Sequence, residues 1–330
     1  GEKSEVAMNK IEALVQQILP SITALRHDLH ACPELGYEEH ETSQHVLSEL
    51  EKIPGLHIRT GVAKTGIVAT LNADQPGRCG RTWTRCRSRR RPACPMPREI
   101  PAGCMPAGMC DAGVLEDPKV DAIFALHGWP DVDHGCVELS AGPTMASTDR
   151  WTLTVHGVGA HAAFPHKGVD PIAVAAYLVT ALQTIVSRTI DPLDSAVVTV
   201  AKFHAGTAAN IIPEKAELEG TMRALNAEVR AKVRARIEEI ALQTAAAFET
   251  KAEIKFHSGY PVTMNDPASV KLVAEAAAEV LGADRVSTEA RPSMGAEDFA
   301  FYAERVPAGY WRLGVGQGAA EKRPMLHQPT

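Results

Sequence analysis

Residues 145–172, MASTDRWTLTVHGVGAHAAFPHKGVDPI, carry the pattern that decides the fold of the central part of the chain. Apolar and polar residues alternate over 150–158, which is typical of a strand with one buried face. The glycine-rich segment 157–166 then predicts a turn. Pro171 stands where a helix can begin, and the apolar sequence after it predicts a helix over 171–189. The stretch therefore predicts a strand, a turn and a helix in succession.

The next hundred residues extend this unit. Alternation predicts strands over 196–203, 214–223 and 251–257, and 226–249 has the pattern of a long amphipathic helix. The order β-α-β-β-α-β is the ferredoxin-like motif, which is complete in itself. We therefore expect residues 149–258 to form a separate domain inserted into another.

The flanking segments, 1–148 and 259–330, predict one α/β domain that the insert divides. The apolar run 120–126 indicates a buried strand with His127 at its carboxyl end, where open α/β sheets place their ligands. The other expected elements are helices over 5–31, 41–52, 267–281 and 297–305, and strands over 57–60, 66–71, 285–288 and 310–314.

Composition limits the class of protein. The chain has 330 residues, of which 45% are hydrophobic and 22% charged, as in soluble globular proteins. The formal charge of −6 argues against nucleic acid or an anionic membrane as a partner. The acidic, polar start is unlike a secretory signal, so we expect reduced thiols and a cytoplasmic location.

Residues 81–110, RTWTRCRSRRRPACPMPREIPAGCMPAGMC, differ from the rest of the chain. The stretch is dense in Arg, Cys and Pro and follows neither helical nor strand periodicity. Most of the seven cysteines lie in or beside it, but none forms a C-x-x-C pair, which argues against a structural zinc site. The basic run 85–91 lacks interleaved aromatic residues, which argues against a nucleic-acid patch.

A few residues are candidates for a functional site because of where they lie relative to the predicted strands and turns. His127 and His327 both follow apolar residues, and imidazole at a strand end is a good ligand for zinc or manganese. His161 lies in the glycine-rich turn, which could present it at a domain interface. Asn210 and Arg223 fall on neighbouring predicted strands, and an Arg beside an Asn suits a substrate carboxylate. Ordinary core, loop or sheet-face positions remain the alternative for each.

Several motifs resemble the M20 metallopeptidase family, and among its members the aminoacylase or hippurate-hydrolase type, which includes the plant auxin-conjugate hydrolases. The matching segments are RHDLHACPELGYEEHETS, LHGWP, the opening stretch, NIIPE, GTMRALN, MGAEDFAFY and LHQP. They cover both ends of the chain and the whole insert. The resemblance implies an α/β catalytic domain with two metal ions and a lid domain that also mediates homodimerisation. It implies hydrolysis of an N-acyl amino acid to a carboxylate and an amino acid.

The same resemblance implies roles for individual residues. His127 and His327 would be metal ligands, for Zn or Mn. His161 would reach the site of the partner subunit and stabilise the oxyanion of the reaction. Asn210 and Arg223 would help to hold the carboxylate of the substrate. A metal pair would activate water and polarise the amide carbonyl, and a glutamate would transfer the proton.

The chain departs from the family pattern where the other ligands belong. The family has a D-x-D-A-L-P segment, then H-A-C-G-H-D, then a Glu-Glu pair, which supply further metal ligands and the general base. None of these occurs in this sequence, and no Glu-Glu pair lies between Gly80 and His127. The family also continues beyond the point that corresponds to His327. The catalytic part is therefore expected to be incomplete.

We hypothesise that residues 81–109 are family sequence in the wrong reading frame. If the last base of each codon is joined to the first two of the next, residues 81–87 can read DVDALP and residues 104–109 can read HACGH. The family frame would return near Ala112, after a deletion. Two functions follow: a metal-dependent amidohydrolase, or a non-catalytic remnant of the family that dimerises through its lid.

Overall fold

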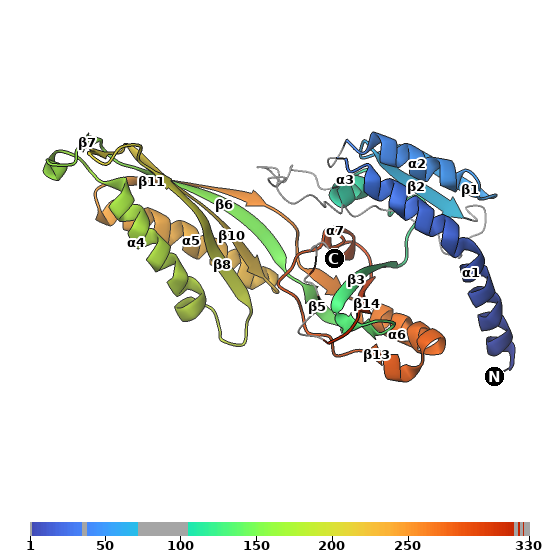
Figure 1. Cartoon of the computed structure of the whole chain (residues 1–330). Helices are drawn as coiled ribbons and strands as arrows, with labels where there is room; N and C mark the ends of the chain where they lie inside the picture. Colours follow the sequence, from blue (N-terminus) through green and yellow to red (C-terminus); the bar gives the residue numbers. More distant parts are fainter. Residues whose placement is uncertain (1, 35–37, 72–104, 320–322, 324–325, 327–330) are drawn as a thin grey trace.

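The computed structural model describes residues 2–34, 38–71, 105–319, 323 and 326, and Figure 1 shows their arrangement. The part that begins with β6 extends to one side of the molecule, and the N-terminal helices lie on the other. Residues 72–104 fall outside the described part, and with them most of the unusual Arg/Cys/Pro-rich stretch. His327 also falls outside it.

The inserted segment, which we call the lid after the expectation above, contains a four-stranded antiparallel sheet in the order β11-β6-β10-β8. Its strands are β6 (Ser147–His156), β8 (Ala196–Ala205), β10 (Lys215–Ala224) and β11 (Lys251–Ser258). This is the ferredoxin-like order, so the β-α-β-β-α-β topology expected from the sequence is present. The boundaries 149 and 258 stay a prediction; β6 begins two residues before the first, at Ser147.

One face of this sheet is covered by α4 (Pro171–Thr184) and α5 (Ala227–Ala247), as Figure 1 shows. A π-helical turn, η2 (Ile185–Thr189), continues α4. Asp170 and Asn226 cap the two helices, because their side chains accept hydrogen bonds from the first backbone N–H groups. The buried core between sheet and helices includes Trp151, Leu178, Leu182, Leu218 and Ile237.

One helical stretch in the described part, Pro171–Thr189, is long and apolar enough to cross a membrane by length and composition. This is weak support for a membrane span, because the core helix of a soluble domain passes the same test. Leu178 and Leu182 of this stretch are fully buried in the lid core.

The segments on either side of the lid, which we call the catalytic part after the same expectation, contain a second four-stranded sheet, in the order β13-β4-β14-β3. It consists of β3 (Ile123–Asp133), β4 (Val137–Glu138), β13 (Val286–Ser287) and β14 (Ala308–Gly316). Helix α6 (Pro267–Leu281) packs on one face through Val270. Helices α3 (Met105–Asp111) and α7 (Ala300–Ala303) contribute to the core cluster that includes Trp129 and Tyr310.

The remaining elements are short or N-terminal. Helices α1 (Glu2–Ala31) and α2 (His40–Leu50) precede the hairpin of β1 (Leu56–Val62) and β2 (Gly66–Leu71). Strands β5 (Gly142–Met145) and β12 (Thr263–Asn265) pair at the two chain crossings next to the lid. In the lid, β7 (Ala160–His161) pairs with β9 (Ile211–Ile212), and η1 (Pro165–Lys167) follows β7. A last short helix, η3 (Ala283–Arg285), leads into β13.

Three sequence predictions need correction here. The strand expected to end before His127 continues to Asp133, so His127 lies within β3. Pro130 is tolerated because β3 is an edge strand of the described sheet and the pairing with β14 is irregular beyond Gly314. The helix expected over 297–305 is only the single turn Ala300–Ala303, and α3 was not predicted.

Strand β3 carries exposed apolar side chains. Phe124 and Leu126 are 37% and 54% exposed. Within the described residues, the hairpin β1-β2 forms a separate sheet and does not continue β3. Within the described residues, β3 is therefore an edge strand that also carries solvent-exposed apolar side chains.

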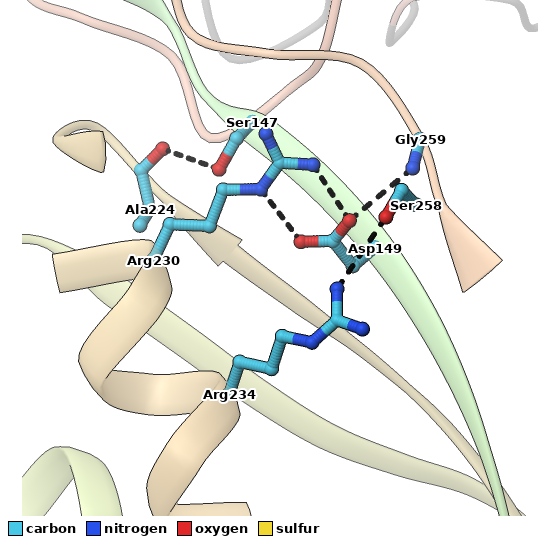
Figure 2. Close-up of polar contacts among 7 residues, drawn as sticks. All are labelled: Ser147, Asp149, Ala224, Arg230, Arg234, Ser258 and Gly259. Atoms are coloured by element: carbon cyan, nitrogen blue, oxygen red, sulfur yellow. Dashed lines mark hydrogen bonds and ion pairs between the residues drawn. The ribbon is translucent and has the colours of Figure 1, made fainter. Parts of the chain in front are cut away.

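A buried ion pair joins the lid to its own chain crossings. Asp149 is 1% exposed and accepts two hydrogen bonds of 2.7 Å, from Nε and Nη2 of Arg230 on α5 (Figure 2). The same carboxylate accepts a hydrogen bond from the backbone N–H of Gly259, just after β11. The hydrogen bonds to Asp149 raise the pKa of Arg230. Asp149 therefore holds α5 and both ends of the insert together.

We expect Asp149→Asn to destabilise the lid strongly, because one partner of a buried ion pair would be left uncompensated. The loss should be about 3 kcal/mol in the free energy of unfolding. Urea unfolding followed by tryptophan fluorescence measures it, since Trp151 lies in the lid core. The control is Glu219→Gln, which breaks the exposed pair with Lys202 and should cost less than about 1 kcal/mol. Equal losses in the two variants would contradict this role for Asp149.

Candidate active site

His161 and Asn210 lie together at the end of the lid. His161 pairs with Ile211 across the two-stranded sheet of β7 and β9, and the backbone N–H of Ala162 donates to the carbonyl of Asn210 (2.9 Å). Both residues are exposed. In Figure 1, β7 lies at the end of the lid that is farthest from β3. His161 is therefore remote from His127 within one chain.

The imidazole of His161 is held in one tautomer. Its Nδ1 accepts a hydrogen bond of 3.1 Å from the backbone N–H of Ala163. An accepting Nδ1 carries no proton, so in the neutral ring the proton is on Nε2. The turn thus presents an N–H donor outward, which is the chemistry that a developing oxyanion requires.

Arg223 lies at the opposite end of β10 from Asn210. Its Nη1 donates to the carbonyl oxygen of Met294 in the catalytic part (3.1 Å), and burial lowers the pKa of its guanidinium. The sequence placed Asn210 and Arg223 on neighbouring strands as one carboxylate site. Within one chain they do not meet, because the length of β10 separates them. Arg223 instead faces the junction between lid and catalytic part.

His127 lies in the middle of β3 and is half-buried. Its Nδ1 is 2.7 Å from the carbonyl oxygen of Gly128. A carbonyl can only accept, so Nδ1 carries the proton and the ring lone pair is on Nε2. This is the form in which a histidine binds a metal, with the other nitrogen fixed by a backbone carbonyl. His127 thus has the chemistry of a ligand.

The described residues do not complete a metal site around His127. No group of three or more His, Cys, Asp or Glu side chains that could hold a metal ion occurs within the described ranges. His327, the second expected ligand, lies outside them. A single histidine does not fit a two-metal centre, which needs several protein ligands for each ion.

Two buried polar residues of the catalytic part were not among the expected site residues. Glu297 is buried, and Tyr310 Oη donates to its Oε2 (3.3 Å). Arg312 is buried beside His127 in the sheet. Its only sequence signal is a charge in an apolar strand, which does not distinguish a buried arginine from an exposed one.

Comparison with known proteins identifies the family of this chain. The model of peptidase family M20/M25/M40 matches residues 99–328. Among curated proteins, N-acetyl-L-cysteine deacetylase of Bacillus subtilis is 35% identical over 337 residues, covering 89% of this chain and 80% of the relative. N-acetyldiaminopimelate deacetylase of Bacillus cytotoxicus is 31% identical, with 88% of each chain covered.

Solved structures share the fold. A putative aminohydrolase from methicillin-resistant Staphylococcus aureus superposes with a TM-score of 0.77 at 23% identity, covering 92% of this chain and 89% of that one. A dinuclear metal-binding M20 peptidase of Bacillus subtilis gives 0.70 at 24% identity, with 94% of each chain covered. The M20-type fold is thus confirmed.

The family match restricts the reading-frame hypothesis. It begins at Glu99, so the literal frame already follows the family upstream of residues 104–109. Helix α3 also buries Met109 and Cys110 of the literal frame in the core. The family match favours a return of the family frame by residue 99, and the burial of Met109 and Cys110 agrees with the literal frame at those two positions. Residues 81–97 are then the part to be explained. The frame shift itself remains a hypothesis. The chain, whose residues 99–328 match the family model, belongs to peptidase family M20/M25/M40, whose members include metal-dependent amidohydrolases.

Proposed function

We propose that the protein acts on the amide bond of N-acyl amino acids, of the hippurate type, and releases a carboxylate and an amino acid. The observation that carries the proposal is the arrangement of the lid turn, which holds His161 with its Nε2–H outward beside Asn210. An exposed N–H donor fits the oxyanion of amide hydrolysis. The names of the two Bacillus deacetylases give N-acetyl amino acids as their substrates, which supports the substrate class.

We further propose that the protein works as a homodimer through the lid. His161 lies far from β3 of its own chain, so it can serve only the site of a second subunit. The outer face of α4 supports this, because the chain has no Asp, Glu, Lys or Arg between Asp170 and Arg188. Tyr177 on this face is 62% exposed and its ring centroid lies 5.2 Å from that of Phe248, so an apolar surface is available for a partner.

The second candidate function is a non-catalytic remnant that keeps the lid but not the metal centre. The specific observation in its favour is that the described residues hold no cluster of metal ligands. The sequence between Gly80 and His127 also lacks the Glu-Glu pair of the family, and with it the general base. The two candidates differ in turnover and share substrate binding and dimerisation.

We expect this chain to bind its substrate but to hydrolyse it slowly. Because it lacks the general base, we expect turnover of N-acetyl-L-cysteine and N-benzoylglycine to be about 10²–10⁴-fold below that of the Bacillus subtilis deacetylase in the same assay. Release of free amine measures turnover with Zn²⁺ or Mn²⁺ supplied, and calorimetry measures binding. Family-like turnover would overturn the view that the catalytic part is incomplete. Failure to bind either compound would overturn the proposed substrate class.

Dimerisation depends on an apolar α4 face, so Tyr177→Glu should produce a monomer. A carboxylate buried in an apolar interface loses its hydration without gaining a partner. Light scattering coupled to size-exclusion chromatography gives the mass directly. The matched control is Lys271→Glu, an exposed charge reversal on α6 of the catalytic part, which should leave the dimer intact. A monomeric wild-type chain, or a dimeric Tyr177→Glu variant, would contradict the proposal.

A further inference from the structure

Arg312 is a buried arginine in the centre of the catalytic sheet. It lies on β14, opposite His127 of β3 on one side and Glu138 of β4 on the other. Only 6% of its surface is exposed. Arginine is rarely buried to this extent unless its donors are paired. A paired acid would be the ordinary explanation.

The guanidinium of Arg312 is held in place by an aromatic ring. Its central carbon lies 4.3 Å from the ring centroid of Trp129. Trp129 in turn contacts His127 edge-on, with ring centroids 5.7 Å apart. The three side chains thus share one face of the sheet. Stacking on Trp129 fixes the plane of the guanidinium and leaves its edges to find hydrogen-bond partners.

Two donors of this guanidinium have no partner among the described residues. Nε and Nη2 of Arg312 are buried and make no hydrogen bond to any residue that the structure describes. Glu138 and Asp131 are close enough to favour the charged form, whereas burial lowers the pKa of Arg312, and neither acid bonds these two nitrogens. An arginine stays protonated under such opposing influences, so Arg312 is a charged group with two donors that lack a partner among the described residues.

Arg230 in the same chain shows what this edge of a guanidinium can hold. Its Nε donates to Oδ2 of Asp149 and its Nη2 donates to Oδ1, each over 2.7 Å (Figure 2). The two nitrogens lie side by side on one edge, at the spacing of the two oxygens of a carboxylate. In Arg312 the same two nitrogens are the ones without a partner in the described part of the chain.

We propose that the Nε/Nη2 edge of Arg312, stacked on Trp129 beside His127, is a binding site for the carboxylate of a small organic acid. A carboxylate offers one oxygen to each donor and balances the buried charge, whereas a chloride ion or a water molecule offers a single atom that both donors must share. His127 on the same face is half-buried. The site does not depend on whether the chain hydrolyses amides.

Titration with sodium acetate and with glycine tests the site, each against sodium chloride at equal ionic strength. Tryptophan fluorescence reports binding at Trp129, and the thermal unfolding midpoint should rise with the ligand because binding stabilises the folded state. Saturable binding of acetate assigns the site to a simple acid, and preference for glycine assigns it to an amino acid. Either result supports a carboxylate site. Absence of saturable binding of both to the wild-type chain overturns it.

Variants locate the site. Arg312→Lys keeps the charge but loses the two-point edge, so we expect the dissociation constant to rise about tenfold or more. The control is Arg305→Lys, which replaces an exposed arginine paired with Asp111 and should leave binding unchanged. Circular dichroism verifies that each variant is folded. Unchanged binding in folded Arg312→Lys contradicts the assignment, and the wild-type titration remains decisive if that variant does not fold.

Discussion

The carboxylate of Asp149 is the point on which the arrangement of the lid depends. It sits at the start of β6, where the chain enters the lid, and it also binds the backbone N–H of Gly259, where the chain leaves. Its ion pair with Arg230 adds α5 to this junction. A buried pair of this kind contributes mainly by requiring one geometry, because any other leaves a charge without a partner. The lid therefore has a defined connection to the catalytic part, and the turn with His161 has a defined position at its far end.

The topology of the lid could be predicted from the sequence because local and tertiary requirements agree there. Alternation over 150–158 matches β6, and the caps Asp170 and Asn226 mark the starts of α4 and α5. The catalytic part was harder to predict, because its strand pairing joins distant segments. Strand β3 continues past His127 since β14 offers it a partner as far as Asp133, and nothing in LHGWP indicates this. Helix α3 likewise forms because Met109 and Cys110 are buried against distant residues.

The site could be predicted in part. Residue type and neighbours selected His161, and the structure adds the tautomer that its chemistry needs. Asn210 was expected on a strand but lies in the turn before β9, and Arg223 lies near the far end of β10, so the two residues do not meet within one chain. Their role at the substrate carboxylate stays a prediction. Arg312 could not be found from the sequence, since its importance lies in the stacking on Trp129 and in two donors without partners among the described residues.

The sequence matches the family over most of its length but departs from it in residues 81–97. Our central hypothesis is that residues 81–97 are family sequence, beginning with the D-x-D-A-L-P segment, read one base out of step. The coding DNA tests it directly. The claim predicts codons for Arg81, Thr82 and Thr84 that end in G, a codon for Arg85 of the form CGC or CGT, and a codon for Cys86 that ends in C, which together read DVDALP in the shifted frame when Arg87 is also encoded by CGN. Third bases that forbid Asp at the junction of Arg81 and Thr82, or Ala at that of Thr84 and Arg85, would contradict it.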